Sequence, residues 1–93
     1  SSFVRSTESG PALSSRQGAV INVALSVAAQ CEWCIAWHVT DAVKAGATED
    51  ELMEAGFLAV LMHGAPAMMY LTTLIDALDE FGEGGGASGS RAG

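Results

Sequence analysis

Apolar residues recur along this chain at intervals of three and four positions, which is the spacing of one face of an α-helix. The pattern runs through residues 14–30, 31–46, 48–63 and 66–82. No stretch alternates apolar and polar residues for long enough to predict a β-strand. We therefore predict an all-α fold, a compact domain of about four helices that oligomerises through apolar helix faces.

Residues that favour helix ends stand at the borders of these segments. Ser14 or Ser15 suits the N-cap of the first segment, where a side-chain oxygen accepts a backbone N–H. Gly46 fits the left-handed position that follows the second segment. Thr48 and Glu51 form the pattern of a capping box at the start of the third.

The two ends of the chain differ in composition from its middle. Residues 1–13 are polar and contain a Gly–Pro turn signal, so we predict an irregular N-terminal segment. Residues 83–93 are rich in glycine and serine, and we predict a flexible tail unless a partner chain orders it. Residues 14–82 then form the helical domain.

Composition adds an expectation about assembly. The 93 residues are 49% hydrophobic and only 16% charged, whereas an average globular chain has about 25% charged residues. So little charge cannot cover the surface of a small domain, and we predict a homo-oligomer, whether dimer, trimer or hexamer. The net charge of −7 repels phosphate groups, and we therefore expect no nucleic-acid partner.

One apolar run raises the question of a membrane span. Residues 55–75 contain no Asp, Glu, Lys or Arg and are long enough to cross a bilayer. His63, Gly64 and Pro66 interrupt the run with a helix stop and a new helix start, so we predict two shorter helices and no membrane partner. No basic and apolar signal segment is visible at the N-terminus, and we expect a cytoplasmic protein.

The residues with the most distinctive chemistry are Cys31, Cys34 and His38, a Cys-x-x-Cys followed four residues later by a histidine. On a helix these three side chains share one face. Two thiols at this spacing can close a disulfide across one turn, and the imidazole can take a proton. A helix that opens at Cys31 also favours a thiolate there, because its positive dipole end faces the sulfur.

Other functions of a Cys-x-x-Cys need different neighbours. A c-type haem site requires histidine directly after the second cysteine, where this chain has Ile35. A zinc site requires four ligands, and beyond the two cysteines and His38 the only further soft ligand is His63. We therefore expect no cofactor and no metal. The remaining alternative is that both cysteines are small core residues.

The neighbours of the motif each have two interpretations. Trp33 and Trp37 lie one turn apart and either pack in the core or a subunit contact, or touch a substrate. Asp41 either holds the ring of His38 in one tautomer or is a solvated carboxylate. Packing is the simplest role for the methionines, which we expect to fill the core: Met53, Met62, Met68 and Met69.

Three stretches together resemble a known family. Residues 31–38, 46–52 and 64–70 are similar to the core of the AhpD-like branch of the carboxymuconolactone decarboxylase family, and the resemblance extends over about residues 16–81. It implies an all-α fold and oligomers of intertwined helical subunits. It also implies alkylhydroperoxidase or related thiol–disulfide activity without a metal or organic cofactor.

The resemblance also assigns roles to the motif. Cys34 resembles the thiol that attacks the peroxide, Cys31 the resolving thiol, and His38 a member of the proton relay. The implied partners are a small peroxide and an external dithiol or thiol reductase. Carboxymuconolactone decarboxylases themselves lack the paired cysteines, so decarboxylation is the less expected activity.

The chain departs from the family pattern at one position. Peroxidase members carry a relay glutamate about three turns before the first cysteine, where this chain has Ala19. The candidates to replace it are Asp41, Glu32 and a residue of another subunit. Two other functions stay open: a redox-sensing or disulfide-exchange protein of the same fold, and a non-catalytic helical interaction module.

Overall fold

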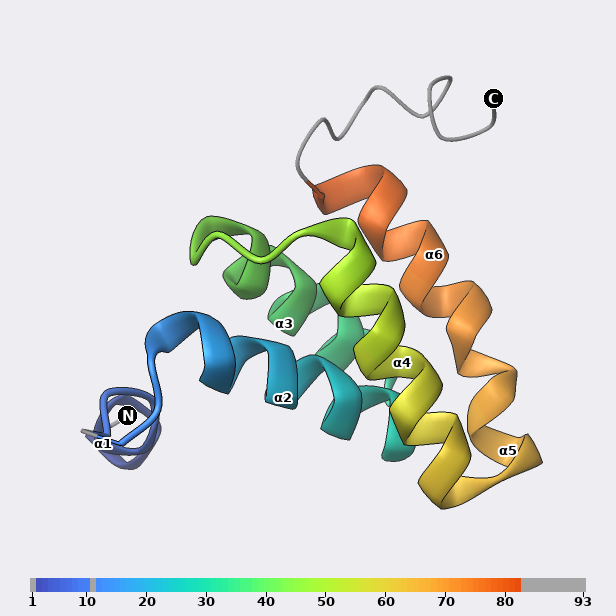
Figure 1. Ribbon diagram of the computed structural model, residues 1–93, viewed down its shortest axis with the longest axis horizontal. Helices are drawn as coiled ribbons and strands as arrows, with labels where there is room; N and C mark the ends of the chain where they lie inside the picture. Colours follow the sequence, from blue (N-terminus) through green and yellow to red (C-terminus); the bar gives the residue numbers. More distant parts are fainter. Residues whose placement is uncertain (1, 11, 83–93) are drawn as a thin grey trace.

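The computed structural model describes residues 2–10 and 12–82, and these residues form helices without β-strands (Figure 1). The all-α prediction is confirmed. The helices in chain order are α1 (Ser2–Glu8), α2 (Ser15–Ala28), α3 (Glu32–Lys44), α4 (Glu49–His63), α5 (Ala65–Met68) and α6 (Tyr70–Phe81). Within the described residues no helix has both the length and the hydropathy to cross a membrane.

The structure differs from the predicted elements at two places. The segment before residue 14 was predicted to be irregular, but Ser2–Glu8 is helical. This helix buries no side chain, so it has no apolar stripe for a pattern to detect. The predicted helix over residues 66–82 is interrupted at Met69, yet Met69 keeps helical dihedral angles, so the apolar spacing continues across the break. The predicted tail, residues 83–93, lies outside the described residues.

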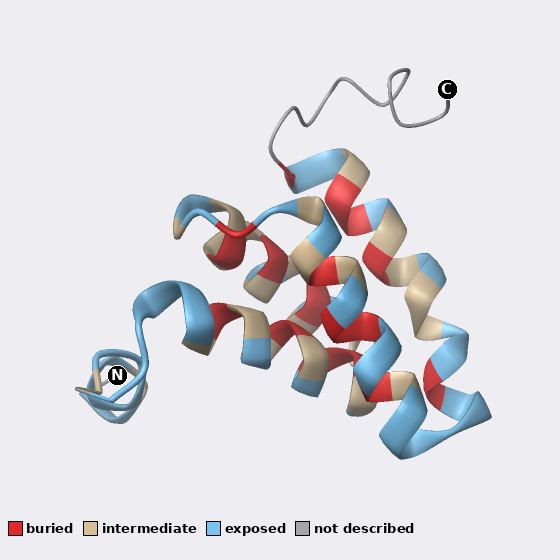
Figure 2. Cartoon of the chain, viewed as in Figure 1, coloured by how far each residue is buried: buried red, intermediate tan, exposed pale blue. Residues whose placement is uncertain are grey.

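Helix α2 is central to the packing, because it contacts both α3 and α4, while α6 lies mainly against α3 and also contacts α4. Figure 2 shows the buried residues on the helix faces that point toward one another. Helix α1 stands at the edge of this arrangement, beyond the start of α2 (Figure 1). The largest fully buried side chains are Val23, Val27, Ile35, Val39, Leu52, Leu74 and Leu78. Burying each contributes about 1.5–3 kcal/mol.

The predicted capping box at the start of α4 is present, and it also joins two helices. The Thr48 hydroxyl accepts the Glu51 N–H at 3.1 Å, and the Thr48 N–H donates to the Glu51 carboxylate at 2.9 Å. Arg16 of α2 forms an ion pair with the same carboxylate. The Thr48 N–H, followed by Arg16, lowers the pKa of Glu51. The stabilisation by this carboxylate is therefore present at neutral pH and disappears as the pH falls through the lowered pKa.

Helices α2 and α3 end in the same kind of hydrogen-bonded turn. At the end of α2 the Cys31 N–H donates to the Ser26 carbonyl at 3.3 Å, and the Gln30 N–H donates to the Val27 carbonyl at 3.0 Å. This is the Schellman pattern, and it places Gln30 in the left-handed region with φ of 59°. A glutamine there has a Cβ atom close to the following carbonyl oxygen, which is unfavourable.

The matching turn after α3 has glycine at the equivalent position. The Ala47 N–H donates to the Ala42 carbonyl at 2.9 Å, and the Gly46 N–H donates to the Val43 carbonyl at 3.0 Å. Gly46 has φ of 98°, which confirms its predicted place after the helix. The two turns therefore allow a comparison of glutamine and glycine at the same position of one type of turn.

We predict opposite effects for exchanges at these two turns. Gln30→Gly should raise the free energy of unfolding by about 0.5–1 kcal/mol, because relief of the left-handed strain exceeds the added freedom of the unfolded chain. Gly46→Gln should lower it by about 1 kcal/mol. Urea unfolding followed by circular dichroism measures both. A Gln30→Gly protein less stable than the parent would contradict this account.

Candidate functional site

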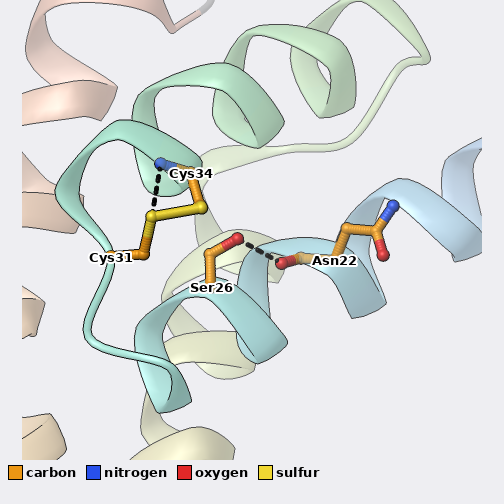
Figure 3. Close-up of a disulfide and its surroundings, with 4 residues drawn as sticks. All are labelled: Asn22, Ser26, Cys31 and Cys34. Atoms are coloured by element: carbon orange, nitrogen blue, oxygen red, sulfur yellow. Dashed lines mark hydrogen bonds between the residues drawn. A yellow bond between two sulfur atoms is a disulfide. The ribbon is translucent and has the colours of Figure 1, made fainter. Parts of the chain in front are cut away.

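The structure brings the two predicted cysteines together. Cys31 and Cys34 form a disulfide, with their Cα atoms 5.2 Å apart. The pair lies where the chain leaves α2 and enters α3, and both residues are half-buried (Figure 3). The interpretation of the cysteines as unconnected core residues is therefore wrong, because they are covalently paired and partly accessible.

The backbone of Cys31 explains why the pair sits at a helix start. Cys31 completes the turn that ends α2, and it is also the N-cap of α3, with extended dihedral angles of φ −116° and ψ 101°. Its sulfur accepts the Cys34 N–H at 3.1 Å, as an oxygen does in a common N-cap (Figure 3). When the disulfide is reduced, this N–H and the dipole of α3 favour negative charge on the Cys31 sulfur.

A polar side chain of α2 lies beside the disulfide without bonding to it. Ser26 is buried, with 4% of its surface exposed, and its hydroxyl donates to the Asn22 carbonyl at 2.7 Å (Figure 3). The Ser26 hydroxyl therefore does not donate to the disulfide. The hydrogen bond to the Cys31 sulfur comes from the backbone N–H of Cys34 instead.

The predicted histidine lies one turn after the second cysteine on α3. His38 is half-buried, and its ring stacks on the ring of Trp37 with centroids 4.7 Å apart and planes at 15°. Its Nδ1 atom is buried and has no hydrogen-bond partner among the described residues. Stacking on Trp37 thus holds the ring, and no described residue uses the hydrogen-bonding capacity of Nδ1.

Two carboxylates approach this ring, and one of them was not predicted. Asp41 follows His38 by three residues on α3, and Glu8 is the last residue of α1. The nearest nitrogen or oxygen atoms of the three side chains lie within 4.8 Å of one another. Glu32, also considered as the relay acid, is exposed on the first turn of α3 and is not part of this group.

Glu8 escaped the sequence analysis for a physical reason. The helix that carries it has no apolar face, so nothing in the pattern indicated that residues 2–8 are ordered or where they lie. The sole signal was that Glu8 is the nearest acid before the motif. Among the described residues, these three side chains are the one group of its kind that could approach a metal ion. One nitrogen and two carboxylates supply fewer than the four ligands of a structural zinc site.

A cavity of about 600 Å³ lies between α1, the first half of α2 and the last half of α3. Glu8, Asp41 and Lys44 line it, together with Ala19 of α2. Position 19 is where the family pattern has its glutamate, so here the acidic side chains reach the cavity from α1 and α3 instead. A small polar molecule therefore has room beside the two carboxylates that approach His38.

The tryptophans and three of the methionines are not in the core of this chain. Trp33 and Trp37 are 72% and 40% exposed, and their rings meet edge to face with centroids 5.4 Å apart. Packing in the core of this chain therefore does not explain the exposed parts of these rings, which leaves a subunit contact or a substrate contact for them. The prediction that the methionines fill the core is wrong for three of them, which are exposed: Met62, Met68 and Met69.

The fold and site define an all-helical protein with a cysteine pair at a helix start. The chain belongs to the carboxymuconolactone decarboxylase family, whose model matches residues 4–77. The family assignment made from the motifs is therefore confirmed.

The chain is also similar to two individual proteins of known sequence or structure. It is 38% identical over 69 residues to uncharacterized protein 4 in the cox locus of Paracoccus denitrificans, a match that covers 74% of this chain. The chain spans 62% of the length of that relative. The crystal structure of a carboxymuconolactone decarboxylase family protein from Legionella pneumophila, in its apo form, matches with a TM-score of 0.82 and 36% identity. That match covers 88% of this chain and 73% of the other.

We predict that His38→Ala slows alkylation of the reduced protein by iodoacetamide near pH 7 by about fivefold. The reason is that a positive imidazole near a thiolate stabilises it, and a fivefold change in rate corresponds to about 1 kcal/mol. His63→Ala is the matched control, since His63 is exposed in the last turn of α4. Equal rates for His38→Ala and the parent would mean that His38 only packs on Trp37.

Proposed function

We propose that the chain is a thiol-dependent peroxidase of the alkylhydroperoxidase type that reduces small organic peroxides or hydrogen peroxide. The observation that carries the proposal is the Cys31–Cys34 pair across the first turn of α3, with His38 one turn further on. Membership in the carboxymuconolactone decarboxylase family, which includes enzymes, supports it.

The first step uses Cys34 as the nucleophile. Its thiolate attacks the terminal oxygen of the peroxide, the O–O bond breaks, and Cys34 becomes a sulfenic acid. The released alkoxide takes a proton and leaves as an alcohol, or as water when the substrate is hydrogen peroxide. His38, one turn from Cys34, supplies this proton after taking it from the thiol.

The second step closes the disulfide. The Cys31 thiolate attacks the sulfur of the sulfenic acid, and hydroxide leaves and is protonated to water. The Cα separation of 5.2 Å lets the bond form within one turn. An external dithiol then reduces the pair by thiol–disulfide exchange. The hydrogen bond from Cys34 N–H at 3.1 Å makes the Cys31 sulfur a good leaving group when Cys34 is attacked.

Peroxide consumption with a dithiol reductant tests the proposal. The parent protein should consume tert-butyl hydroperoxide catalytically with dihydrolipoamide, and Cys34→Ser should reduce the rate to background. Cys31→Ser should undergo one oxidation to a sulfenic acid, trapped by dimedone, and then stop. If both thiols of the parent survive one equivalent of peroxide, the proposal is contradicted.

Disulfide exchange or redox sensing is a second candidate, favoured by a specific observation. Ala19 is buried on α2 where the family pattern has an acid, so α2 supplies no carboxylate to the relay. The N-capped Cys31 sulfur assists disulfide exchange without any peroxide. In the same assay, one oxidation of both thiols without sustained turnover would select this function over the peroxidase.

We also propose that the protein acts as a homo-oligomer. The supporting observation is a set of large apolar side chains that are more than half exposed in the single chain. Figure 2 colours most of the end of α4 and of α5 as exposed, and several of these residues lie there. The set includes Leu25, Trp33, Phe57, Leu58, Leu61, Met62, Met68 and Met69. Exposed apolar patches of this kind usually mark interaction surfaces.

Light scattering coupled to size-exclusion chromatography tests the assembly. The parent should elute at a multiple of its chain mass of 9.5 kDa. The double variant Leu61→Lys and Met62→Lys should shift toward the monomer, because each lysine places a charge in the buried contact. Glu80→Lys, an exposed polar position of α6, should leave the mass unchanged. A parent that elutes as a monomer would contradict this prediction.

A further inference from the structure

We propose that Glu8 of α1 is a positioning residue for the thiol chemistry: it completes a proton path that runs from Cys34 through His38 to solvent. The inference rests on the proposed use of Cys34 and His38 as a thiol and its base. It assigns a role to a helix that contributes no side chain to the core.

The geometry around His38 supports the part of this path that leads from His38 to solvent. The buried Nδ1 atom of the ring has no hydrogen-bond partner among the described residues. The closest donor and acceptor atoms of Glu8, His38 and Asp41 lie within 4.8 Å of one another. A separation of up to this size is spanned by one bridging water or closed by a rotation of the long glutamate side chain. Glu8 is exposed, so its carboxylate exchanges protons freely with solvent.

The charged side chains of the neighbouring cavity, which His38 itself does not line, leave few alternatives for this role. The side chains that α2 contributes to the cavity are uncharged, including Ala19 and Asn22. Helix α3 contributes Asp41 and Lys44, whose charges oppose each other, and α1 contributes Glu8. Glu8 is therefore the acid of this group that comes from outside α3, and it is exposed to solvent.

The proton balance of the first step shows what the carboxylate does. His38 takes the proton of the Cys34 thiol, which produces a thiolate and an imidazolium. The negative charge of Glu8 stabilises that imidazolium and so increases the fraction of thiolate. When the O–O bond breaks, the imidazolium gives its proton to the alkoxide. Glu8 then connects the neutral ring with solvent for the next cycle.

The test is the alkylation rate of Cys34 as a function of pH. It uses a Cys31→Ser background, which leaves one thiol and keeps a good N-cap for α3. In this background Glu8→Gln should alkylate about two- to fivefold more slowly between pH 6 and 7.5, because one nearby charge is lost. The rates should converge at high pH, where the thiol ionises without the imidazolium. The difference should shrink in 0.5 M salt, since the interaction is screened.

Three further variants make the result specific. Glu8→Asp, which keeps the charge, should restore part of the rate. Glu80→Gln, which removes an acid from α6, should behave like the background protein. Asp41→Asn reports the contribution of the other carboxylate. The proposal is overturned if Glu8→Gln matches the background at every pH, or if Glu80→Gln slows alkylation as much as Glu8→Gln does.

This assay separates the inference from the proposed function, because it contains no peroxide and needs no turnover. If the parent protein consumes no peroxide but Glu8→Gln still slows alkylation, the proposed proton path stands and the proposed peroxidase activity is refuted. If Glu8→Gln changes neither peroxide consumption nor the alkylation rate, the peroxidase stands and the role of Glu8 is refuted.

Discussion

The site depends on one residue, Cys31, that links two helices through its hydrogen bonds. The N–H of Cys31 closes the turn at the end of α2, while its sulfur accepts the Cys34 N–H at the start of α3. No spacer separates the two helices beyond this short turn, so the direction of α3 and the position of both sulfurs are set together. The cysteine pair is therefore built into the helix junction and does not depend on a separate loop.

The chemistry around this junction is divided among three helices. Helix α3 carries both Cys34 and His38, the proposed thiol and its proposed base, one turn apart. Helix α2 supplies the surface against which α3 packs, and its alanine at position 19 leaves that side of the cavity uncharged. Helix α1 supplies Glu8, an exposed carboxylate that lies close to His38. A small domain thus gathers reactive groups from chain segments that are far apart in the sequence, without using its core for them.

The parts of this arrangement that could be predicted are those determined by local interactions. Gly46 and the pair Thr48 and Glu51 mark helix borders through their own backbone hydrogen bonds, and the structure has those bonds. The spacing of the two cysteines likewise determines that their sulfurs can meet. These interactions join residues that are close neighbours along the chain, so they can be predicted from the spacing of residue types.

The parts that could not be predicted depend on tertiary contacts or on which side chains are exposed at the surface. Helix α1 has no apolar face, so neither its helical state nor the approach of Glu8 to His38 leaves a periodic signal. Trp33 and Met62 look like core residues by type, and burial is decided by which helix face meets a neighbour. The helix break at Met69 could not be predicted, because the apolar spacing of the sequence continues through it.

The most direct test of the account is the redox equilibrium of the cysteine pair in buffers of dithiothreitol and its oxidised form. Alkylation of free thiols followed by mass spectrometry counts how many are reduced in each buffer. The account predicts that Cys31 and Cys34 are oxidised and reduced together in one reversible two-electron transition. The mass of the oxidised species should be that of a single chain, because the disulfide forms within the chain. Thiols that stay reduced in the oxidising buffers, or that pair only with a second chain, would contradict it.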